Sequence, residues 1–430
     1  MLVSELLWQL FNKSTGVCTD TRLLRPGQLF FALQGENFNG NLFASKALEL
    51  GALAVVVSDP NLKGDDQYIL VENTLLTLQA LATQYRAEFQ IPVIGITGSN
   101  GKTTTKELMA SVLKTTFRVH FTQGNLNNHL GVPLTILSMP EDTEIAIIEM
   151  GANHQGEIRE LCQIAQPTHG LITNIGKAHL EGFGGYEGVK KAKSELYDYL
   201  SKHQGLIFYN QDDEVLHSVL PAQCRTISYG TFLETPPDYI FELVESEPFL
   251  HLKMISPLQE NIRSQLYGLY NVPNIMAAAV VGHHFQVTLS AIQNGVYEYI
   301  PNNQRSQWVS WQGHQVVMDA YNANPSSMAL AIQTFRKHYA AHKILILGDM
   351  RELGEWSLPE HQTIVDKINE DKWAEVILIG DWFGHTRHTF HHFATTDEAK
   401  TYVNAQTWPP STILLKGSRG MKLEKIIQQD

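Results

Sequence analysis

A strand followed directly by a glycine-rich turn and a helix is the feature that most restricts how this chain can fold. The apolar run Val93–Ile96 leads into Gly98-Ser-Asn-Gly101, and Lys102 and Thr103 open a helical pattern. Glycines let successive backbone N–H groups curl around phosphate oxygens, and a helix N-terminus adds partial positive charge. We expect Lys102 on the outer phosphates and the Thr103 hydroxyl on Mg²⁺. The pattern predicts a phosphate-binding loop in an α/β fold.

The loop departs at one position from the common pattern G-x-x-x-x-G-K-[ST], because Ile96 stands where the first glycine is usual. A glycine-rich surface turn before a helix is the competing interpretation. The order of strand, loop, Lys-Thr and helix favours phosphate binding.

Length and composition limit the classes of protein that remain. A chain of 430 residues should form two or three domains. Its net charge of −12 gives no basic surface for nucleic acid, so we expect no nucleic-acid partner. Three scattered cysteines indicate neither a disulfide framework nor a zinc site. The longest apolar run, Ala52–Val57, is too short for a membrane span, and the start lacks a signal-peptide pattern, so we expect a cytoplasmic protein.

Three regions differ in pattern, and we expect domains at 1–87, 88–302 and 303–430, with a linker at 301–304. Apolar, β-branched runs separated by helical patterns are typical of parallel α/β sheets. The first region also has helical patterns at Leu42–Leu50 and Leu75–Phe89. In the first region the predicted strands are Leu29–Leu33, Ala52–Val57 and Tyr68–Val71. In the second region, after the phosphate loop, they are Ile145–Glu149, Gly170–Asn174 and Leu206–Asn210. In the third region they are Gln315–Met318, Lys343–Gly348, Val376–Gly380 and Thr412–Leu415.

Charged side chains follow two of these strands. Glu149 ends its strand, and the carboxyl ends of parallel strands form the ligand-binding edge of such sheets. Beside a phosphate loop it suits Mg²⁺ coordination, although a glutamate at a helix start is the alternative. His179 follows the strand that ends at Asn174, where it suits a metal or a phosphate, but a lone histidine is as often structural.

The run Lys190-Lys-Ala-Lys193 has two interpretations. It reads most simply as the solvated face of a helix. One of its lysines could instead be buried beside a metal, where its pKa falls and the neutral amine becomes nucleophilic. Such an amine can react with CO₂ to form a carbamate, which behaves as a carboxylate ligand.

Several loops are rich in amides or mixed charge. Gln123–Asn128 suits hydrogen bonding to a ligand, and it also suits an ordinary turn. Asp319–Pro325 follows a strand, and its last residues suit helix capping equally well. Gly348–Gly354 and Lys416–Arg419 follow the next strands. Polar loops gathered on one sheet edge indicate a site.

Taken together, these segments resemble the Mur ligase family, the ATP-dependent amide-forming ligases of peptidoglycan precursor synthesis. The likeness covers nearly the whole chain, from Thr19–Arg22 and the loop Thr97–Thr103 to Glu149–His154, Asp319–Pro325 and Lys416–Arg419. It implies an α/β fold of three domains. A UDP-substrate domain would precede a central parallel-sheet ATPase domain of P-loop type, and a Rossmann-like domain would follow.

The resemblance also implies roles by position. Lys102, His179 and a carbamylated Lys193 would be catalytic. ATP would contact the loop residues Gly98, Ser99, Asn100, Gly101, Lys102, Thr103 and Thr104. It would also contact Asn274, which matches an adenine-contacting asparagine of the family. Arg305 and Asp319, which match residues that close the third domain over ATP, would contact it as well. Mg²⁺ would lie near Thr103, Glu149, His179 and Lys193. The two substrates would contact Thr19, Asp20, Arg22, Asn127, Asn128, Asn322, Asn324, Lys416 and Arg419.

Within the family, the likeness implies addition of D-alanyl-D-alanine to UDP-N-acetylmuramoyl-tripeptide through an acyl phosphate, with ATP and Mg²⁺ as cofactors, by a monomer. A sibling that adds a single amino acid, or a folylpolyglutamate-type ligase, stays open. The diaminopimelate-adding relatives carry Asp-Asn-Pro-Arg in the C-terminal domain, and this chain has no such run. A nucleotide-dependent switch or scaffold is the alternative outside enzymes.

Overall fold

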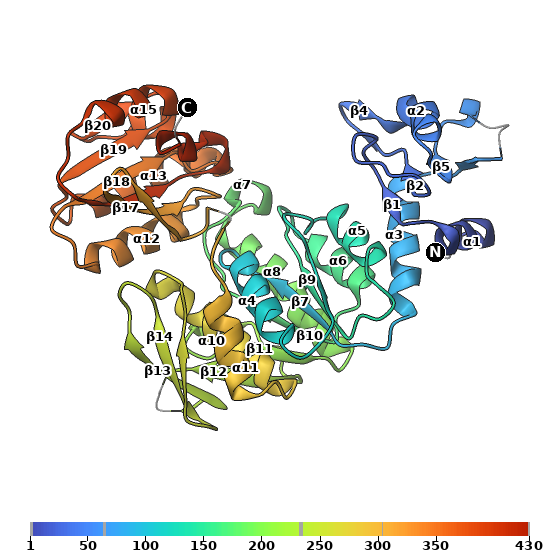
Figure 1. Cartoon of the computed structure of the whole chain (residues 1–430), viewed down its shortest axis with the longest axis horizontal. Helices are drawn as coiled ribbons and strands as arrows, with labels where there is room; N and C mark the ends of the chain where they lie inside the picture. Colours follow the sequence, from blue (N-terminus) through green and yellow to red (C-terminus); the bar gives the residue numbers. More distant parts are fainter. Residues whose placement is uncertain (1–2, 63–65, 232–234, 303, 429–430) are drawn as a thin grey trace.

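The computed structural model describes residues 3–62, 66–231, 235–302 and 304–428. Figure 1 shows three α/β lobes in chain order, with the N-terminal and C-terminal lobes on opposite sides of a central one. The three main sheets have four, nine and six strands. The expected class of fold, three α/β units with mainly parallel sheets, is confirmed.

The N-terminal lobe is a small parallel sheet with the strand order β1-β2-β5-β6. Its long last helix, α3, packs on α5 and α6 of the central lobe. The Tyr85 hydroxyl at the end of α3 donates to the Met139 carbonyl over 2.7 Å, so α3 joins the two lobes. The elements are α1 (Glu5–Lys13), β1 (Val17–Cys18), β2 (Leu29–Phe31), β3 (Gln34–Gly35), β4 (Phe38–Asn39), α2 (Ala44–Glu49), β5 (Ala54–Val57), β6 (Tyr68–Leu70) and α3 (Thr74–Ala87).

The central lobe contains the nine-stranded sheet, in the order β15-β14-β13-β12-β11-β10-β7-β9-β8. Strands β7 to β13 run parallel to their neighbours in the sheet. Strands β14 and β15 extend the sheet beyond β13 with antiparallel pairing. Its strands are β7 (Val93–Thr97), β8 (Val119–Phe121), β9 (Ile145–Glu149), β10 (His169–Ile172), β11 (Leu206–Asn210), β12 (Arg225–Gly230), β13 (Tyr239–Glu245), β14 (His251–Ser256) and β15 (Glu260–Arg263). Its helices are α4 (Lys102–Leu113), α5 (Gly131–Leu137), α6 (Glu157–Ala165), α7 (Leu180–Phe183), α8 (Tyr186–Lys202), α9 (Glu214–Ser218), α10 (Val272–His284) and α11 (Leu289–Glu298).

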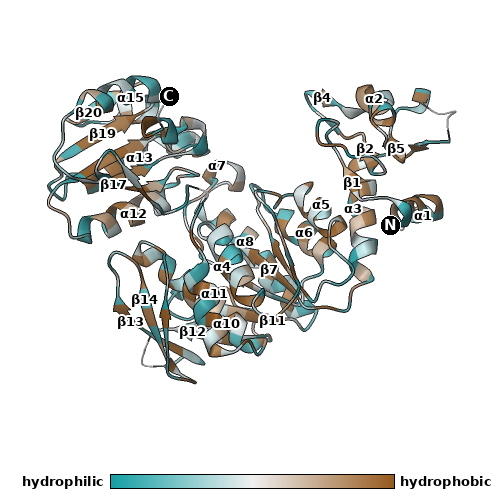
Figure 2. Ribbon diagram, viewed as in Figure 1, coloured by the Kyte–Doolittle hydropathy of each residue, from teal (hydrophilic) through white to brown (hydrophobic). Residues whose placement is uncertain are grey.

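Both faces of the central sheet are buried, which explains its continuous apolar strands. Along β9, Ala146 and Ile148 pack into the core on the α5–α6–α8 side. Ile145 and Ile147 pack into the core on the α4–α10–α11 side. Figure 2 shows hydrophobic colour concentrated on the strands of this sheet and of the C-terminal one.

The C-terminal lobe has the strand order β16-β17-β21-β18-β19-β20, parallel except for β16. The return of β21 between β17 and β18 makes it a doubly wound sheet, and its loops at the carboxyl ends of the strands face one edge. The elements are β16 (Gln307–Trp311), β17 (His314–Asp319), α12 (Pro325–Lys337), β18 (Lys343–Gly348), α13 (Ser357–Ile368), β19 (Glu375–Ile379), α14 (Asp381–Gly384), β20 (His391–Phe393), α15 (Thr396–Ala405) and β21 (Thr412–Lys416).

Every strand predicted from an apolar run is present within one or two residues of its expected ends. The helix expected at Leu42–Leu50 starts as a 3₁₀ turn at Gly40–Phe43 and becomes α-helical only at Ala44. The short edge strands, the interior strand β12 and the extension β13–β15 were not predicted, because polar and charged residues interrupt their patterns. Within the described residues, no helix combines the length and the apolar character needed to cross a membrane.

Candidate active site

The glycine-rich loop joins β7 to α4 at the carboxyl edge of the central sheet. Gly98 (φ 144°) and Gly101 (φ 80°) adopt backbone conformations that favour glycine. A Cβ on Gly98 would lie 2.0 Å from Thr173 Oγ1, so the loop also needs glycine for space. The Lys102 ammonium folds over the loop and donates to the carbonyls of Gly98 at 2.6 Å and Ser99 at 3.3 Å. The backbone N–H groups of Ser99 and Asn100 donate to the carbonyl and to Oδ1 of Asn174, each at 3.0 Å, so this residue also helps to hold the loop in shape.

Glu149 lies beside this loop, at the end of β9. Its Oε1 accepts hydrogen bonds from Thr103 Oγ1 at 3.2 Å and Asn127 Nδ2 at 2.8 Å. Its Oε2 is buried and makes no hydrogen bond to any described residue. A buried carboxylate oxygen without a donor is costly, and oxygen is the ligand that Mg²⁺ prefers. The chemistry of Glu149 and Thr103 therefore fits a magnesium ion.

No group of three or more His, Cys, Asp or Glu side chains in the described parts of the chain could hold a metal ion. Mg²⁺ at phosphate-transfer sites is commonly bound through one or two carboxylates together with the phosphates of the substrate. A single well-placed carboxylate beside a phosphate loop suits that mode of binding.

Lys193 is buried in α8 and is 2% exposed. Burial lowers its pKa well below the usual value, and the nearby charge of Lys102 lowers it further. Its ammonium lies 5.2 Å from the centre of the Phe183 ring. The alternative of a solvated lysine face is therefore wrong for Lys193, while Lys191 on the same helix is exposed.

The C-terminal lobe contacts the phosphate loop directly. Asn324 caps α12 through Ser327, and its Nδ2 donates to Asn100 Oδ1 over 2.7 Å. The backbone N–H of Lys177 donates to Ser326 Oγ at 2.9 Å. Asn324 therefore caps α12 and also contacts the phosphate loop, so its role as a helix cap does not exclude a role in the site.

Two ion pairs complete this interface. Lys177 Nζ lies 2.6 Å from Glu360 Oε1. His179 Nδ1 pairs with Glu352 Oε2, and this contact lowers the pKa of Glu352. His179 has a positive φ of 51° at the start of α7. The structure therefore places His179 between the central and C-terminal lobes.

Asp319 and Lys416 form a pair at the carboxyl ends of β17 and β21. Lys416 Nζ lies 2.5 Å from Asp319 Oδ2, and the two side chains are 2% and 14% exposed. The Arg305 guanidinium stacks 3.7 Å from the Tyr321 ring, while its buried Nε makes no hydrogen bond to described residues. Burial lowers the pKa of Lys102; the charge of Glu149 opposes this shift, and the charge of Arg305 adds to it.

We predict that Lys416→Met lowers the free energy of unfolding of the C-terminal lobe by about 3 kcal/mol, because it leaves Asp319 as a nearly buried, uncompensated charge. Six of the seven tryptophans lie after residue 303, so tryptophan fluorescence in urea reports mainly on this lobe. Lys425→Met, which removes a half-exposed lysine 3.6 Å from Asp397, is the matched control and should change stability little. Equal effects of both changes would contradict the prediction.

Other predicted residues have partners within the protein. Asn274 is buried, accepts from Thr105 Oγ1 at 3.0 Å and donates to Asn271 Oδ1 at 2.8 Å, and it lies against Gly101. Asn128 Oδ1 accepts from the N–H of Gly131 at 2.8 Å. Asn322 Oδ1 accepts from the N–H of the next residue, Ala323, at 2.9 Å. Their roles toward a ligand stay predictions.

The remaining candidate residues lie in the N-terminal lobe, in α4 and after β21 in the C-terminal lobe. Arg22 binds Asp20 over 2.5 Å in the N-terminal lobe, and this contact lowers the pKa of Asp20 to about 2. Thr19 precedes this pair. Thr104 is buried in the first turn of α4. Arg419 Nη1 donates to Gln304 Oε1 at 2.7 Å and lies 2.9 Å from Glu424.

Sequence reasoning missed four charged residues of the site: Lys106, Lys177, Glu352 and Glu360. Lys106 follows the three threonines of α4 and is fully buried near Glu149. Glu352 lies in the loop Gly348–Gly354, which the sequence marks as polar, and Glu360 lies in α13. Only the packing of the lobes shows which residues of the central lobe they contact. The spacing Thr103-x-x-Lys106, one helical turn, was the one available signal for the first of them.

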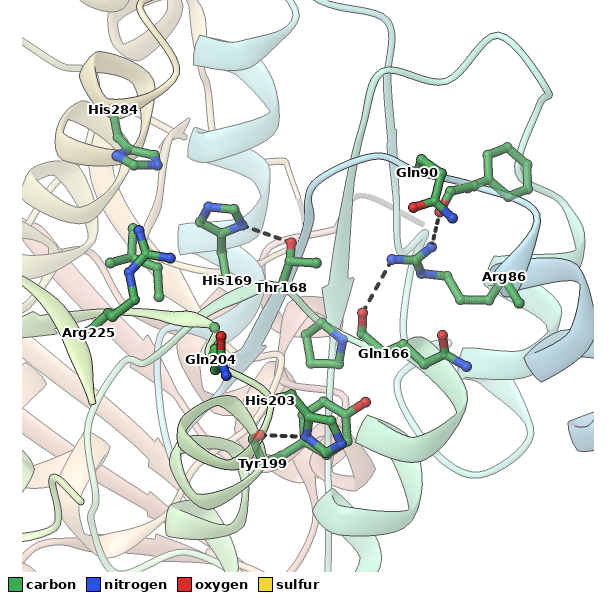
Figure 3. Close-up of a pocket in the computed structure, with 15 residues that line it drawn as sticks. Arg86, Gln90, Gln166, Thr168, His169, Tyr199, His203, Gln204, Arg225 and His284 are labelled. Carbon is green, nitrogen blue, oxygen red and sulfur yellow. Dashed lines mark hydrogen bonds between the residues drawn. The ribbon is translucent and has the colours of Figure 1, made fainter. Parts of the chain in front are cut away.

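A separate hollow of about 630 Å³ lies at the opposite, amino edge of the central sheet. Figure 3 shows its basic side chains, among them Arg86, His169, His203 and His284. Arg86 donates to the Ala165 carbonyl at 2.9 Å, and His203 Nδ1 lies 2.8 Å from the Tyr199 carbonyl. Helix C-terminal carbonyls meet at this edge, and basic side chains stabilise them. Two of the basic side chains in this hollow, Arg86 and His203, are therefore explained by contacts with helix carbonyls.

A phosphate loop on a parallel sheet, with a third lobe packed on it, defines a three-domain P-loop enzyme. The models for the "Mur ligase family, catalytic domain", the "Mur ligase middle domain" and the "Mur ligase, glutamate ligase domain" match residues 13–95, 96–282 and 304–419. The chain belongs to the Mur ligase family, whose members are ATP-dependent peptide ligases.

Individual relatives agree with this family. The UDP-N-acetylmuramoyl-tripeptide–D-alanyl-D-alanine ligase of Bacillus subtilis is 39% identical, over 96% of this chain and 92% of its own length. The enzyme of the same name from Escherichia coli is 33% identical, with the same shares.

Two solved structures are similar over nearly the whole chain. MurF from Acinetobacter baumannii has a TM-score of 0.88 and 29% identity, covering 99% of this chain and 97% of the other. MurF ligase from Thermotoga maritima in complex with ADP has a TM-score of 0.86 and 26% identity, covering 97% and 96%.

Proposed function

We propose that this chain joins D-alanyl-D-alanine to the terminal carboxylate of UDP-N-acetylmuramoyl-tripeptide, with ATP converted to ADP and phosphate. The observation that carries the proposal is the direct contact between the phosphate loop and the C-terminal lobe at Asn100 and Asn324. A nucleotide in the loop would lie beside the polar loops of the third lobe. Relatives of this name cover nearly the full chain, which supports the particular reaction.

The reaction needs an activated acid, because a carboxylate does not react with amines at neutral pH. Phosphoryl transfer from ATP would give an acyl phosphate, which the amine of the dipeptide attacks with release of phosphate. Positioning and charge neutralisation are the main requirements of this transfer. The loop N–H groups, Lys102 and the N-terminus of α4 would hold the phosphates in place.

Mg²⁺ belongs to the proposal because the buried Oε2 of Glu149 accepts no hydrogen bond from the described residues, although Lys106 Nζ lies 3.9 Å from it. Glu149 and Thr103 would hold it, and it would neutralise charge on the phosphates when bound. His179 would stay near this site through its contact with Glu352. Lys193, as a carbamate, would supply a second negative group.

The proposal divides the chain as 1–87 for the UDP-sugar peptide, 88–302 for ATP and 303–430 for the incoming dipeptide. The polar loops of the C-terminal lobe at Asn322, Asn324, Lys416 and Arg419 would contact that dipeptide. Water would be excluded from the acyl phosphate by approach of the outer lobes to the central one. We propose a monomer in the cytoplasm as the working form.

The test is a mass-spectrometric assay with ATP, D-alanyl-D-alanine and UDP-muramoyl tripeptides that carry lysine or diaminopimelate as the third residue. We expect a pentapeptide product and release of phosphate that needs both the acid and the amine. Hydrolysis of ATP without them would instead support a nucleotide-dependent switch. Product formation with a single amino acid in place of the dipeptide would support a sibling ligase.

We predict that the N-terminal lobe carries the affinity for the UDP-linked substrate. A chain of residues 72–430 keeps α3, which packs on α5 and α6, and so leaves the central lobe covered. Calorimetry should show a loss of affinity for UDP-N-acetylmuramoyl-tripeptide of at least about a hundredfold, with ADP binding unchanged. Unchanged affinity for the tripeptide substrate would contradict the assignment of this lobe.

A further inference from the structure

Lys106 is a charged side chain next to the proposed metal carboxylate, and no step of the proposed reaction uses it. It lies one turn after Lys102 on α4, and it is 0% exposed. Its ammonium donates to the Thr122 carbonyl over 2.5 Å. It lies 2.9 Å from Glu107 Oε1 and 3.9 Å from Glu149 Oε2. A lysine buried this deeply is stable only with such partners.

The contacts of Lys106 join the parts of the site that a metal would use. Thr122 binds Lys106 through its carbonyl and accepts the backbone N–H of Glu149 at 3.0 Å through its hydroxyl. The segment after Thr122 contains Asn127, which donates to Glu149 Oε1. Lys106 therefore anchors both the carboxylate and the loop that orients it.

The charges around this point balance without a metal. Glu107 and Glu149 supply two negative charges, and Lys106 lies between one oxygen of each. Lys102 adds a second positive charge beside the loop, where the charge of Glu149 acts on it. A divalent cation that approached Glu149 alone would meet two ammonium groups. ATP phosphates would change this balance, because they bring several negative charges to the loop.

We propose that Lys106 is a positioning residue that holds Glu149 in place and keeps divalent cations out of the site until a nucleotide arrives. The inference rests on the proposed role of Glu149 toward Mg²⁺. Its chemical consequence is an ordered site: the metal binds together with the nucleotide and not before it. A merely structural lysine, which only ties α4 to β8, would have no such effect on metal affinity.

The test measures binding of Mn²⁺, by the loss of its free paramagnetic resonance signal, to the full chain without nucleotide. In Lys106→Met, two carboxylates lose their buried counter-charge, so Mn²⁺ should bind at least about tenfold more tightly than in the unmodified chain. Lys106→Gln also removes the charge but retains a donor for the Thr122 carbonyl, so it should show the same gain. It serves as the test if the methionine variant does not fold. Lys106→Arg retains the charge and should bind Mn²⁺ as weakly as the unmodified chain.

Lys114→Met is the matched control, since Lys114 follows the same helix and lies 4.1 Å from the centre of the same Phe121 ring that Lys106 faces at 5.5 Å. It should leave Mn²⁺ affinity unchanged. Unchanged or weaker Mn²⁺ binding in both neutral Lys106 variants would overturn the inference, as would an equal gain in Lys114→Met. Glu149→Gln in the Lys106→Gln background should abolish the gain. Ligase activity of the unmodified chain tests the proposed function separately.

Discussion

Lys102→Ala should lower the turnover of the ligase by at least about a thousandfold while the chain remains folded. The lysine folds over the phosphate loop, with its Nζ donating hydrogen bonds to the carbonyls of Gly98 and Ser99. Its loss removes two hydrogen bonds within a loop and a positive charge from the site of phosphoryl transfer. Steady-state release of phosphate in the presence of both substrates measures the effect.

Circular dichroism and urea unfolding of the same variant would show whether the fold is intact. Lys114→Ala is a suitable control, because it removes a lysine near the end of the same helix and away from the loop. A folded Lys102→Ala chain with near-normal turnover would refute the phosphate-loop assignment. Loss of activity in both variants would indicate a general effect of helix α4.

The sheets could be predicted because parallel strands buried on both faces leave continuous apolar runs in the sequence. Ile145–Glu149 is the clearest case, where the predicted and observed ends agree. The tight turn between β7 and α4 was equally predictable, because its glycines are needed for local backbone geometry and space. Glu149 followed from its place at the carboxyl end of a strand.

What could not be predicted depends on contacts between distant segments. The pairs His179–Glu352 and Lys177–Glu360 join lobes whose relative placement no local pattern encodes. Burial of a lysine is equally hidden: in the run Lys190–Lys193, only the packing of α8 on its neighbours separates the buried Lys193 from the exposed Lys191. The family resemblance singled out Lys193, whereas sequence physics favoured a solvated face.

Lys193→Ala should lower turnover at least about a hundredfold, and this loss should be chemically reversible. Burial and the charge of Lys102 lower the pKa of Lys193 well below its usual value, which favours the neutral amine that can react with CO₂. Carbamate formation would place a negative group near the proposed magnesium site, where the unmodified lysine could carry a positive charge. Mass spectrometry of the intact chain under CO₂-rich conditions offers a direct measurement of the added group.

Short carboxylic acids separate this role from simple packing. Acetate should restore part of the activity of Lys193→Ala, because it fits the vacated space and supplies the missing carboxylate. Lys193→Arg should be inactive with or without acetate, since its fixed positive charge disfavours Mg²⁺. Lys191→Ala, an exposed neighbour on α8, should behave like the unmodified chain. Full activity of Lys193→Ala without acetate would exclude the carbamate, and loss of activity without any rescue would assign Lys193 to packing beside Phe183.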